Sequence, residues 1–191
     1  MKLKKDFYLQ EDVVQIAREL LGKVLCTNIS GKFTSGIITE TEAYAGISDR
    51  ASHAYGGRRT NRTETMFAEG GVAYVYLCYG MHHLFNVVTN RENIPHAVLV
   101  RGIELLDGVD VILKRRNKKD LSSKICNGPG TVSQGLGIKT IHSGLSLVAD
   151  KIWIEDQSIE VPQHRIKKSP RIGVDYAGAD AKLLYRFFTE I

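Results

Sequence analysis

The hydrophobic and polar positions along the chain predict helices in some stretches and strands in others. Between residues 11 and 21 apolar side chains recur every three or four positions, which predicts an amphipathic helix that Gly22 can end. Further helices are expected at 107–116 and at 129–136, the second beginning at its proline. Strands are expected at 23–29, 32–41, 71–89 (as a hairpin), 97–103, 145–155 and 182–189.

One long stretch, residues 45–69, has weak periodicity and many small or polar residues. A loop of that length inside a compact domain is usually functional or disordered. There is no internal repeat, low-complexity tract or clear linker elsewhere. The pattern therefore predicts a single α+β domain over residues 1–191, with mainly antiparallel strands.

The expected hairpin contains three closely spaced tyrosines. Tyr74 and Tyr76 lie two positions apart, so they share one face of a strand, and Tyr79 falls on the other face. Tyr79-Gly80 is typical of a tight turn, because glycine tolerates positive φ. A tyrosine at such a tip can pack internally, contact a protein partner or wedge between bases; from this stretch alone, packing is favoured.

Composition and charge narrow the class of protein. The chain has 191 residues and 43% apolar residues, which argues against disorder and allows a proper core. No apolar run is long enough to span a membrane, and no signal peptide is expected at the N-terminus. Three widely spaced cysteines without a Cys-x-x-Cys pair are typical of reduced thiols. The net charge of +5 and pI of 9.1 suit a polyanionic partner.

Two carboxylates, Glu40 and Glu42, lie two positions apart on an expected strand and so share a face. One interpretation is a solvated strand edge. The other is a general base beside the aromatic ring of Tyr44, with partial burial raising the carboxyl pKa toward the working pH. The sequence alone favours the solvated edge.

The loop that follows offers one histidine and several arginines. His53 can be an ordinary hydrogen-bonded loop residue, or it can stack and donate in a pocket. Arg58, Arg59 and Arg62 are phosphate-binding candidates beside two glycines, with a solvated loop as the alternative. The basic run at 114–119 is expected to be a solvated face. No metal site is expected, because the remaining histidines are isolated or point to opposite sides of a strand, and no nucleophile elbow or P-loop is present.

Several spaced motifs, taken together, resemble the alkyladenine (3-methyladenine) DNA glycosylase family. The resemblance spans nearly the whole chain and rests on the ordered set. The set is Glu40-Thr41-Glu42-Ala43-Tyr44, His53, Gly56-Gly57-Arg58, Met66-Phe67, Tyr74-Val75-Tyr76, Tyr79-Gly80-Met81, Asn86, Arg101, Asn127-Gly128-Pro129 and Pro170-Arg171-Ile172-Gly173. One departure is Thr63, where the family commonly has asparagine; it affects local loop contacts.

The resemblance implies a role for each matched residue. Glu42 would be the general base that activates water, with Arg101 beside it, near the water and the phosphate of the flipped nucleotide. Tyr79 would be inserted into the duplex. The base-binding pocket would consist of Tyr44 on one face of the extruded base, His53 and Tyr76 on the other, and Asn86 at the border, where it helps to exclude bases with an extra amino group.

The same resemblance implies a mainly antiparallel curved sheet with surrounding helices and a protruding β-hairpin. The implied activity is removal of alkylated or deaminated purines from double-stranded DNA, leaving an abasic site and using no cofactor. A monomer is expected, cytoplasmic and nucleoid-associated in a bacterium or nuclear in a eukaryote. A non-catalytic module for distorted DNA would keep Tyr79 and the basic residues but would not need Glu42; an RNA-binding module is a third possibility.

Overall fold

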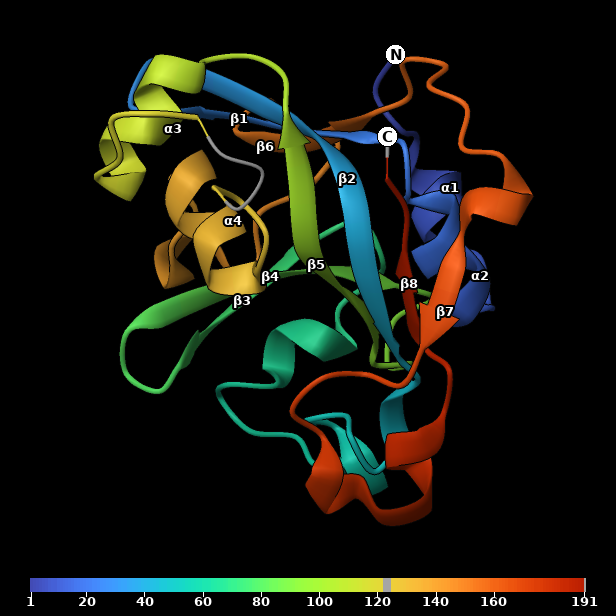
Figure 1. Ribbon diagram of the computed structural model, residues 1–191. Coiled ribbons are helices and arrows are strands. Elements are labelled where there is room, and N and C mark those ends of the chain that lie inside the picture. Colours follow the sequence, from blue (N-terminus) through green and yellow to red (C-terminus); the bar gives the residue numbers. More distant parts are fainter. Residues whose placement is uncertain (122–124, 191) are drawn as a thin grey trace.

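A curled antiparallel sheet organises the protein, seen in the computed structural model, which describes residues 1–121 and 125–190 (Figure 1). Six strands run in the order β3-β4-β5-β2-β1-β6, and β8 pairs with both β2 and β7. The strands are β1 (Val24–Ile29), β2 (Lys32–Tyr44), β3 (Ala73–Cys78), β4 (His82–Thr89), β5 (His96–Leu105), β6 (Ile152–Glu155), β7 (Lys167–Ser169) and β8 (Arg186–Phe188). The α+β class, the antiparallel curved sheet and the protruding β3–β4 hairpin are confirmed.

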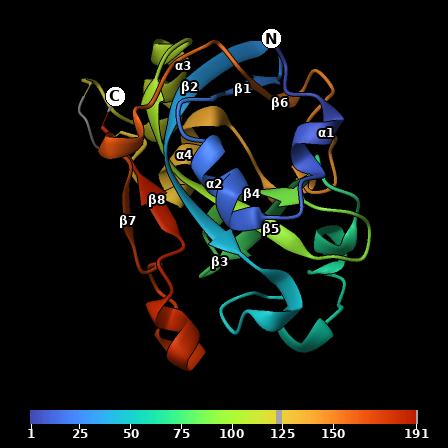
Figure 2. The ribbon, with the colours of Figure 1, turned by 90° about the vertical axis from the view of Figure 1, so that its right-hand side faces the viewer.

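The α-helices pack against the sheet through one shared core. They are α1 (Lys5–Tyr8), α2 (Val13–Glu19), α3 (Val109–Arg116) and α4 (Pro129–Leu136), and Figure 2 shows α1 and α2 in front of the sheet. Asp12 caps α2 by accepting hydrogen bonds from the backbone N–H groups of Val14 and Gln15. Short 3₁₀ helices occupy Gly46–Ser48, Tyr55–Gly57, Glu64–Phe67, Thr140–His142, Gln163–Arg165 and Asp175–Lys182. Within the described residues no helix is long and apolar enough to cross a bilayer.

Two expected strands are only partly correct. Of residues 145–155, only Ile152–Glu155 form a strand, because the preceding segment crosses the start of β3 through a single bridge between Val72 and Ser146 and then turns. Of residues 182–189, only Arg186–Phe188 are extended, since a 3₁₀ helix continues to Lys182. In both segments the apolar pattern correctly predicted which side chains are buried, but only part of each segment pairs with the sheet.

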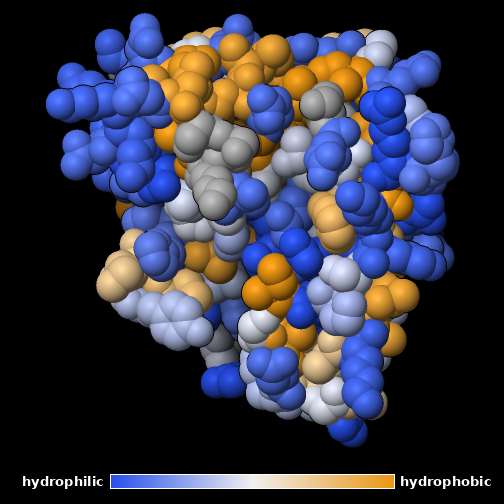
Figure 3. Space-filling model, in the orientation of Figure 1, coloured by the Kyte–Doolittle hydropathy of each residue, from blue (hydrophilic) through white to orange (hydrophobic). Residues whose placement is uncertain are grey.

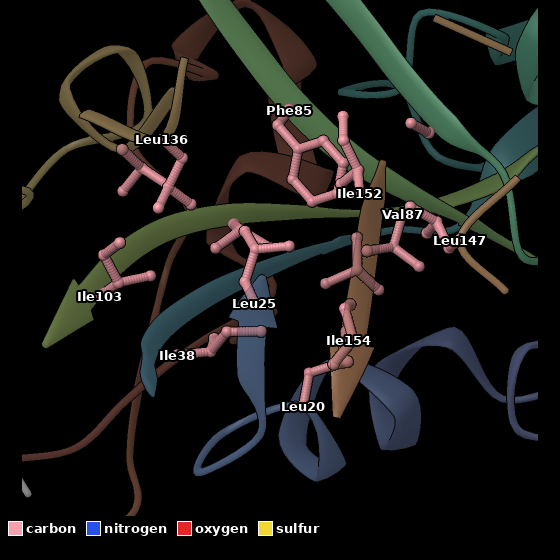
Figure 4. Close-up of a cluster of buried hydrophobic side chains, with 14 of the residues drawn as sticks. Leu20, Leu25, Ile38, Phe85, Val87, Ile103, Leu136, Leu147, Ile152 and Ile154 are labelled. Atoms are coloured by element: carbon pink, nitrogen blue, oxygen red, sulfur yellow. The ribbon is translucent and has the colours of Figure 1, made fainter. Parts of the chain in front are cut away.

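The main core lies between one face of the sheet and the helices (Figure 4). Its side chains converge from α2, α4 and most strands, and they include Leu20, Leu25, Ile38, Phe85, Val87, Ile103, Leu136, Leu147, Ile152 and Ile154. The hydroxyl of Thr41 donates to the carbonyl of Ala17 at 2.7 Å, which joins α2 to β2. This packing fixes the sheet from behind, so the alternate side chains of β2–β5 are held rigidly on the opposite face.

Candidate active site

The register of four strands assembles a row of side chains on the face of the sheet that points away from the main core. Tyr74 lies opposite Asn86, Asn86 opposite Leu99, and Leu99 opposite Glu42. Residues directly opposite one another in a ladder share a face, so the row crosses β3, β4, β5 and β2. The register then shifts, with Glu40 opposite Gly102 and Thr41 opposite Val100, which leaves Arg101 as the extra residue of a bulge.

A cavity of about 670 Å³ opens over this row. The expected site residues that line it come from β2, the 45–69 loop, the hairpin, β4 and β5; they are Tyr44, His53, Arg62, Tyr76, Tyr79, Asn86 and Arg101. The residues around 172–174 close its other side. In Figure 1 the 45–69 loop and the 170–182 segment lie together below the end of β2. Hydrophilic residues cover most of the molecular face in Figure 3.

Glu42 is fully buried and does not itself line the cavity, although its contacts Tyr44, Arg101 and Ile172 do. The Tyr44 hydroxyl and the backbone N–H of Ile172 each donate to its carboxylate at 2.8 Å, and Arg101 Nε lies 3.4 Å away. Burial raises the pKa of Glu42 above the ordinary value of 4.5, and Arg101 and the two hydrogen bonds offset only part of that rise. The solvated-edge interpretation is wrong, because β2 lies inside the sheet, with β1, β5 and β8 as neighbours.

Glu40 has a different environment from Glu42. Its Oε1 accepts from Arg101 Nε at 2.8 Å and from Arg186 Nε at 2.6 Å. The carboxylate therefore balances two arginines at the bulge and holds Arg101 in place beside Glu42. Arg186 was not identified from the sequence, because its position on β8 becomes relevant only through pairing with β2.

His53 packs against two tyrosines of β3. Its Nδ1 is hydrogen-bonded to the Tyr74 hydroxyl at 3.0 Å, and its ring meets Tyr76 edge-on with centroids 4.7 Å apart. Burial, together with Arg62 and Arg58, lowers the pKa of His53 to about 4, so the imidazole is neutral near pH 7. Tyr74, which is only 2% exposed, thus has a second role beyond packing: its hydroxyl orients the histidine.

Asn86 is buried at the middle of the row. Its Nδ2 donates to the carbonyl of Tyr74 at 3.1 Å and to that of Leu84 at 3.3 Å. These two contacts fix the plane of the amide, so Asn86 is a rigid part of the cavity wall.

The three loop arginines differ in their surroundings. Arg62 lines the cavity; its guanidinium lies 4.8 Å from the centroid of the Tyr76 ring, and its Nη2 is 3.5 Å from His53 Nε2. Arg59 is held by Glu64 through contacts of 2.9 and 2.7 Å. Arg58 is exposed, and neither it nor Arg59 lines the cavity.

Tyr79 stands at the tip of the hairpin. Its φ is 50° and that of Gly80 is 71°, the left-handed pair that a type I′ turn requires, and the N–H of Met81 donates to the carbonyl of Cys78 at 3.1 Å. Because Cys78 lies opposite His82, the loop spans the three residues 79–81. The side chain is 90% exposed, on the rim of the cavity. Internal packing is therefore wrong for Tyr79, although it is right for Tyr74.

Among the described residues no group of three or more histidine, cysteine, aspartate or glutamate side chains is placed to hold a metal ion. Two features were not identified from the sequence: the backbone N–H of Ile172, which donates to Glu42, and a buried ion pair between Asp49 and Arg171, which lies against Tyr44. The only sequence signal for Arg171 and Ile172 was the Pro170–Gly173 motif, to which the family resemblance assigns no role, and Asp49 lies in none of the quoted motifs.

Comparisons with known proteins agree with this geometry. A buried carboxylate under an aromatic cavity, with an exposed tyrosine on its rim, is the arrangement expected of an enzyme that acts on an extruded base. Residues 6–190 match the family described as methylpurine-DNA glycosylase. Relatives named "Putative 3-methyladenine DNA glycosylase" are 46% identical in Chlamydia felis, 44% in Clostridium perfringens and 43% in Bacillus thuringiensis. These alignments cover 98–100% of this chain and 95–96% of the relatives.

The chain therefore belongs to the methylpurine-DNA glycosylase family, whose members are DNA-repair hydrolases of N-glycosidic bonds. The family resemblance seen in the sequence motifs is confirmed.

Proposed function

We propose that this protein removes alkylated or deaminated purines, 3-methyladenine among them, from double-stranded DNA and leaves an abasic site. The observation that carries the proposal is Glu42: its carboxylate has no exposed surface and a raised pKa, and it accepts two hydrogen bonds. Its three contacts, Tyr44, Arg101 and Ile172, line the cavity of about 670 Å³. A general base works best when its pKa lies near the working pH. Burial moves this carboxyl in that direction.

The cavity walls suit a flat, electron-poor ligand. Tyr44, Tyr76 and His53 present aromatic surfaces, and stacking contributes about 1–3 kcal/mol per base. Alkylated purines are often cationic, and a cation is attracted to the face of an aromatic ring. Because His53 is neutral, it adds no repulsion against such a base.

Extrusion of the base leaves a gap in the duplex. Flipping costs a few kcal/mol, least for damaged pairs. Tyr79 projects from the hairpin beside the cavity, and we assign it the role of filling that gap. Arg58 and Arg62 are assigned to the DNA backbone and the pocket mouth; Arg59 is a weaker candidate, since Glu64 already pairs with it.

The chemistry follows from one carboxylate. Cleavage of an N-glycosidic bond passes through a transition state that resembles an oxocarbenium ion, as in glycoside hydrolysis. As the C1′–N bond breaks, the negative charge of Glu42 stabilises the developing sugar cation, and Arg101 lies beside the carboxylate. Water then adds to C1′ and passes its proton to Glu42. A cationic base leaves without a general acid. No lysine lines the cavity among the described residues, which favours direct hydrolysis with an uncut strand over a Schiff base. One copy of the chain carries all these groups, so a monomer suffices.

The test is base release from a duplex that contains 3-methyladenine or hypoxanthine. Wild type should release the free base, and Glu42→Gln should bind the duplex with similar affinity while releasing base about 10²–10⁴-fold more slowly. Wild type that binds damaged duplex without releasing base would identify a non-catalytic DNA module. Preference for structured RNA over damaged duplex would favour the RNA-binding alternative.

A further inference from the structure

Arg171 makes a buried ion pair at the far end of β2. Its side chain is fully buried and pairs with Asp49 through both carboxylate oxygens; the contact from Nη2 to Oδ1 is 2.8 Å. Nη1 also donates to the carbonyl of Ala43 at 2.8 Å, and Nη2 to that of Asp180 at 3.2 Å. One guanidinium thus joins the end of β2, the 45–69 loop and the 175–182 segment.

The same guanidinium lies behind the cavity wall. Its central carbon is 4.9 Å from the centroid of the Tyr44 ring, on which it stacks as a cation on an aromatic face. Tyr44 lines the cavity and Arg171 does not, so the ring separates the guanidinium from the space assigned to the base. Arg171 therefore limits how far Tyr44 can retreat when a base stacks on it.

The peptide that follows Arg171 reaches the general base directly. The backbone N–H of Ile172 donates to Glu42 Oε1 at 2.8 Å, while Tyr44 donates to Oε2 of the same carboxylate. A shift of Arg171 would therefore disturb both donors that orient Glu42. Asp49 is anchored in turn, since it accepts from the backbone N–H groups of Ala45 and Ala51 at 3.0 Å.

The buried Asp49–Arg171 ion pair is expected to contribute more to the placement of its neighbours than to the free energy of unfolding. Two charges lose their hydration when they are buried, and replacing such a pair with apolar groups is often neutral or stabilising. Arg171 Nε is also buried without a hydrogen-bond partner in the described part of the chain, which is a further cost. A network that contributes little net stability yet orients the reacting carboxylate is expected where precise placement matters.

We propose that Arg171, held by Asp49, is a positioning residue for catalysis: it fixes the Tyr44 ring as a stacking platform and aims the Ile172 N–H and the Tyr44 hydroxyl at Glu42. This inference rests on the function proposed above. Arg171 contacts neither the base nor the water and acts only through these neighbours.

Loss of Arg171 should also change the pH dependence. The charged and titratable groups around Glu42 are Glu40 and Tyr44 on β2, Tyr76 on β3, Arg101 on β5, Arg186 on β8, and Arg171. Of these, Arg171 is the positive charge on the far side of the Tyr44 ring. Loss of this charge, together with a weaker hydrogen bond from Ile172, raises the pKa of Glu42 further. The acid limb, which is the fall in the rate of base release as pH decreases, then moves to higher pH.

The experiment compares single-turnover base release from alkylated duplex, at saturating enzyme and as a function of pH, for wild type, Arg171→Met, Arg171→Lys and Asp49→Asn. Arg115→Met is the matched control. Arg115 is partly buried and, like Arg171, joins separate elements, here through Thr34 and the carbonyl of Gly135, but it does not line the cavity. Each variant is also characterised by its Tm and its Kd for the duplex.

The expected result is a rate that falls about 10- to 100-fold in Arg171→Met, with Kd unchanged within threefold and the acid limb at higher pH. Arg171→Lys should restore the acid limb but not the full rate, since lysine keeps the charge and loses the paired contacts. Asp49→Asn should also lower the rate of base release, and this variant provides the test if Arg171→Met does not fold.

The inference is overturned if the Arg171 and Asp49 variants behave like Arg115→Met, with a lower Tm but the wild-type rate and acid limb. Wild type that releases no base would instead refute the proposed function. The two failures are therefore distinct, because the first is read from the ratio of variant to wild type and the second from wild type alone.

Discussion

Replacing Tyr79 with asparagine should stabilise the free protein and impair the enzyme at the same time. Tyr79 has a φ of 50°, and a left-handed conformation costs an L-residue roughly 1–2 kcal/mol. Asparagine tolerates this region better, and Asn-Gly is the preferred pair for a type I′ turn. The tyrosine ring is 90% exposed, so little packing is lost. We expect a gain of about 1 kcal/mol, or about 2–4 °C in Tm for a chain of this length.

On DNA the same change should remove the wedge. If the ring stacks in the gap left by the flipped base, its loss costs about 1–3 kcal/mol. That free energy corresponds to a decrease of about 5- to 150-fold in base release at subsaturating enzyme. Thermal unfolding of the free protein and single-turnover release from alkylated duplex measure the two effects separately.

The β1–β2 hairpin supplies a matched control. Its turn, Ser30-Gly31, has φ values of 56° and 69°, close to those of Tyr79-Gly80, and Ser30 does not line the cavity. Ser30→Asn should raise Tm similarly and leave base release unchanged. A lower Tm in Tyr79→Asn would refute the claim that the left-handed conformation of Tyr79 is strained. Base release within twofold of the wild-type rate would refute the insertion of Tyr79 into the duplex.

Further predictions concern the pocket and its rim. Asn86→Ser should increase release of purines with an extra amino group relative to alkylated adenine, measured by competition between two lesions; an unchanged ratio would exclude Asn86 from selectivity. The His53 pKa of about 4 lies below its ordinary value of 6.5, so the unfolded chain takes up a proton first as pH falls. Wild type should therefore lose Tm relative to His53→Gln between about pH 6.5 and 4, whereas parallel curves would contradict the buried, neutral ring. Arg58→Gln should reduce the salt slope of DNA binding by about 1, and Arg59→Gln by much less, because Glu64 already neutralises Arg59; equal slopes would contradict this difference.

Short-range sequence patterns were sufficient to predict several of the elements around the site. The helical period of α2, the proline that begins α4 and the Tyr79-Gly80 turn each depend on a few neighbouring residues, and all three are confirmed. These features were predictable because their causes lie within one turn or one strand. Strand alternation does not apply to Tyr79, which lies in the turn after β3 and lines the same cavity as Tyr76.

The residues next to Glu42 in the sequence could not decide whether its carboxylate is solvated or buried. Whether a strand carboxylate is solvated or buried depends on the strands beside it, and here β5 and β8 flank β2 at that position. The pairing of Asn86 with Leu99 and of Leu99 with Glu42 is equally non-local. Asp49 and Arg171 lie 122 positions apart, so only the folded chain brings them together behind Tyr44.

The same limit explains the shortened strands. Leu147 is buried, as its apolar pattern implied, but it is buried in a loop whose backbone N–H bonds to the carbonyl of Gly71. Hydrophobicity reports burial, and only the pairing partners decide whether a buried segment belongs to a sheet.

The central claim is that the buried carboxylate of Glu42 is the base in the reaction, and the most direct test is the pH dependence of single-turnover base release. Glu42 must be ionised to accept a proton, and its pKa is raised above 4.5, so the wild-type rate should fall as pH falls through a midpoint above that value. In Glu42→Gln the residual slow release should show no such limb. An acid limb retained in Glu42→Gln, or a wild-type rate that is independent of pH down to 4.5, would contradict the account.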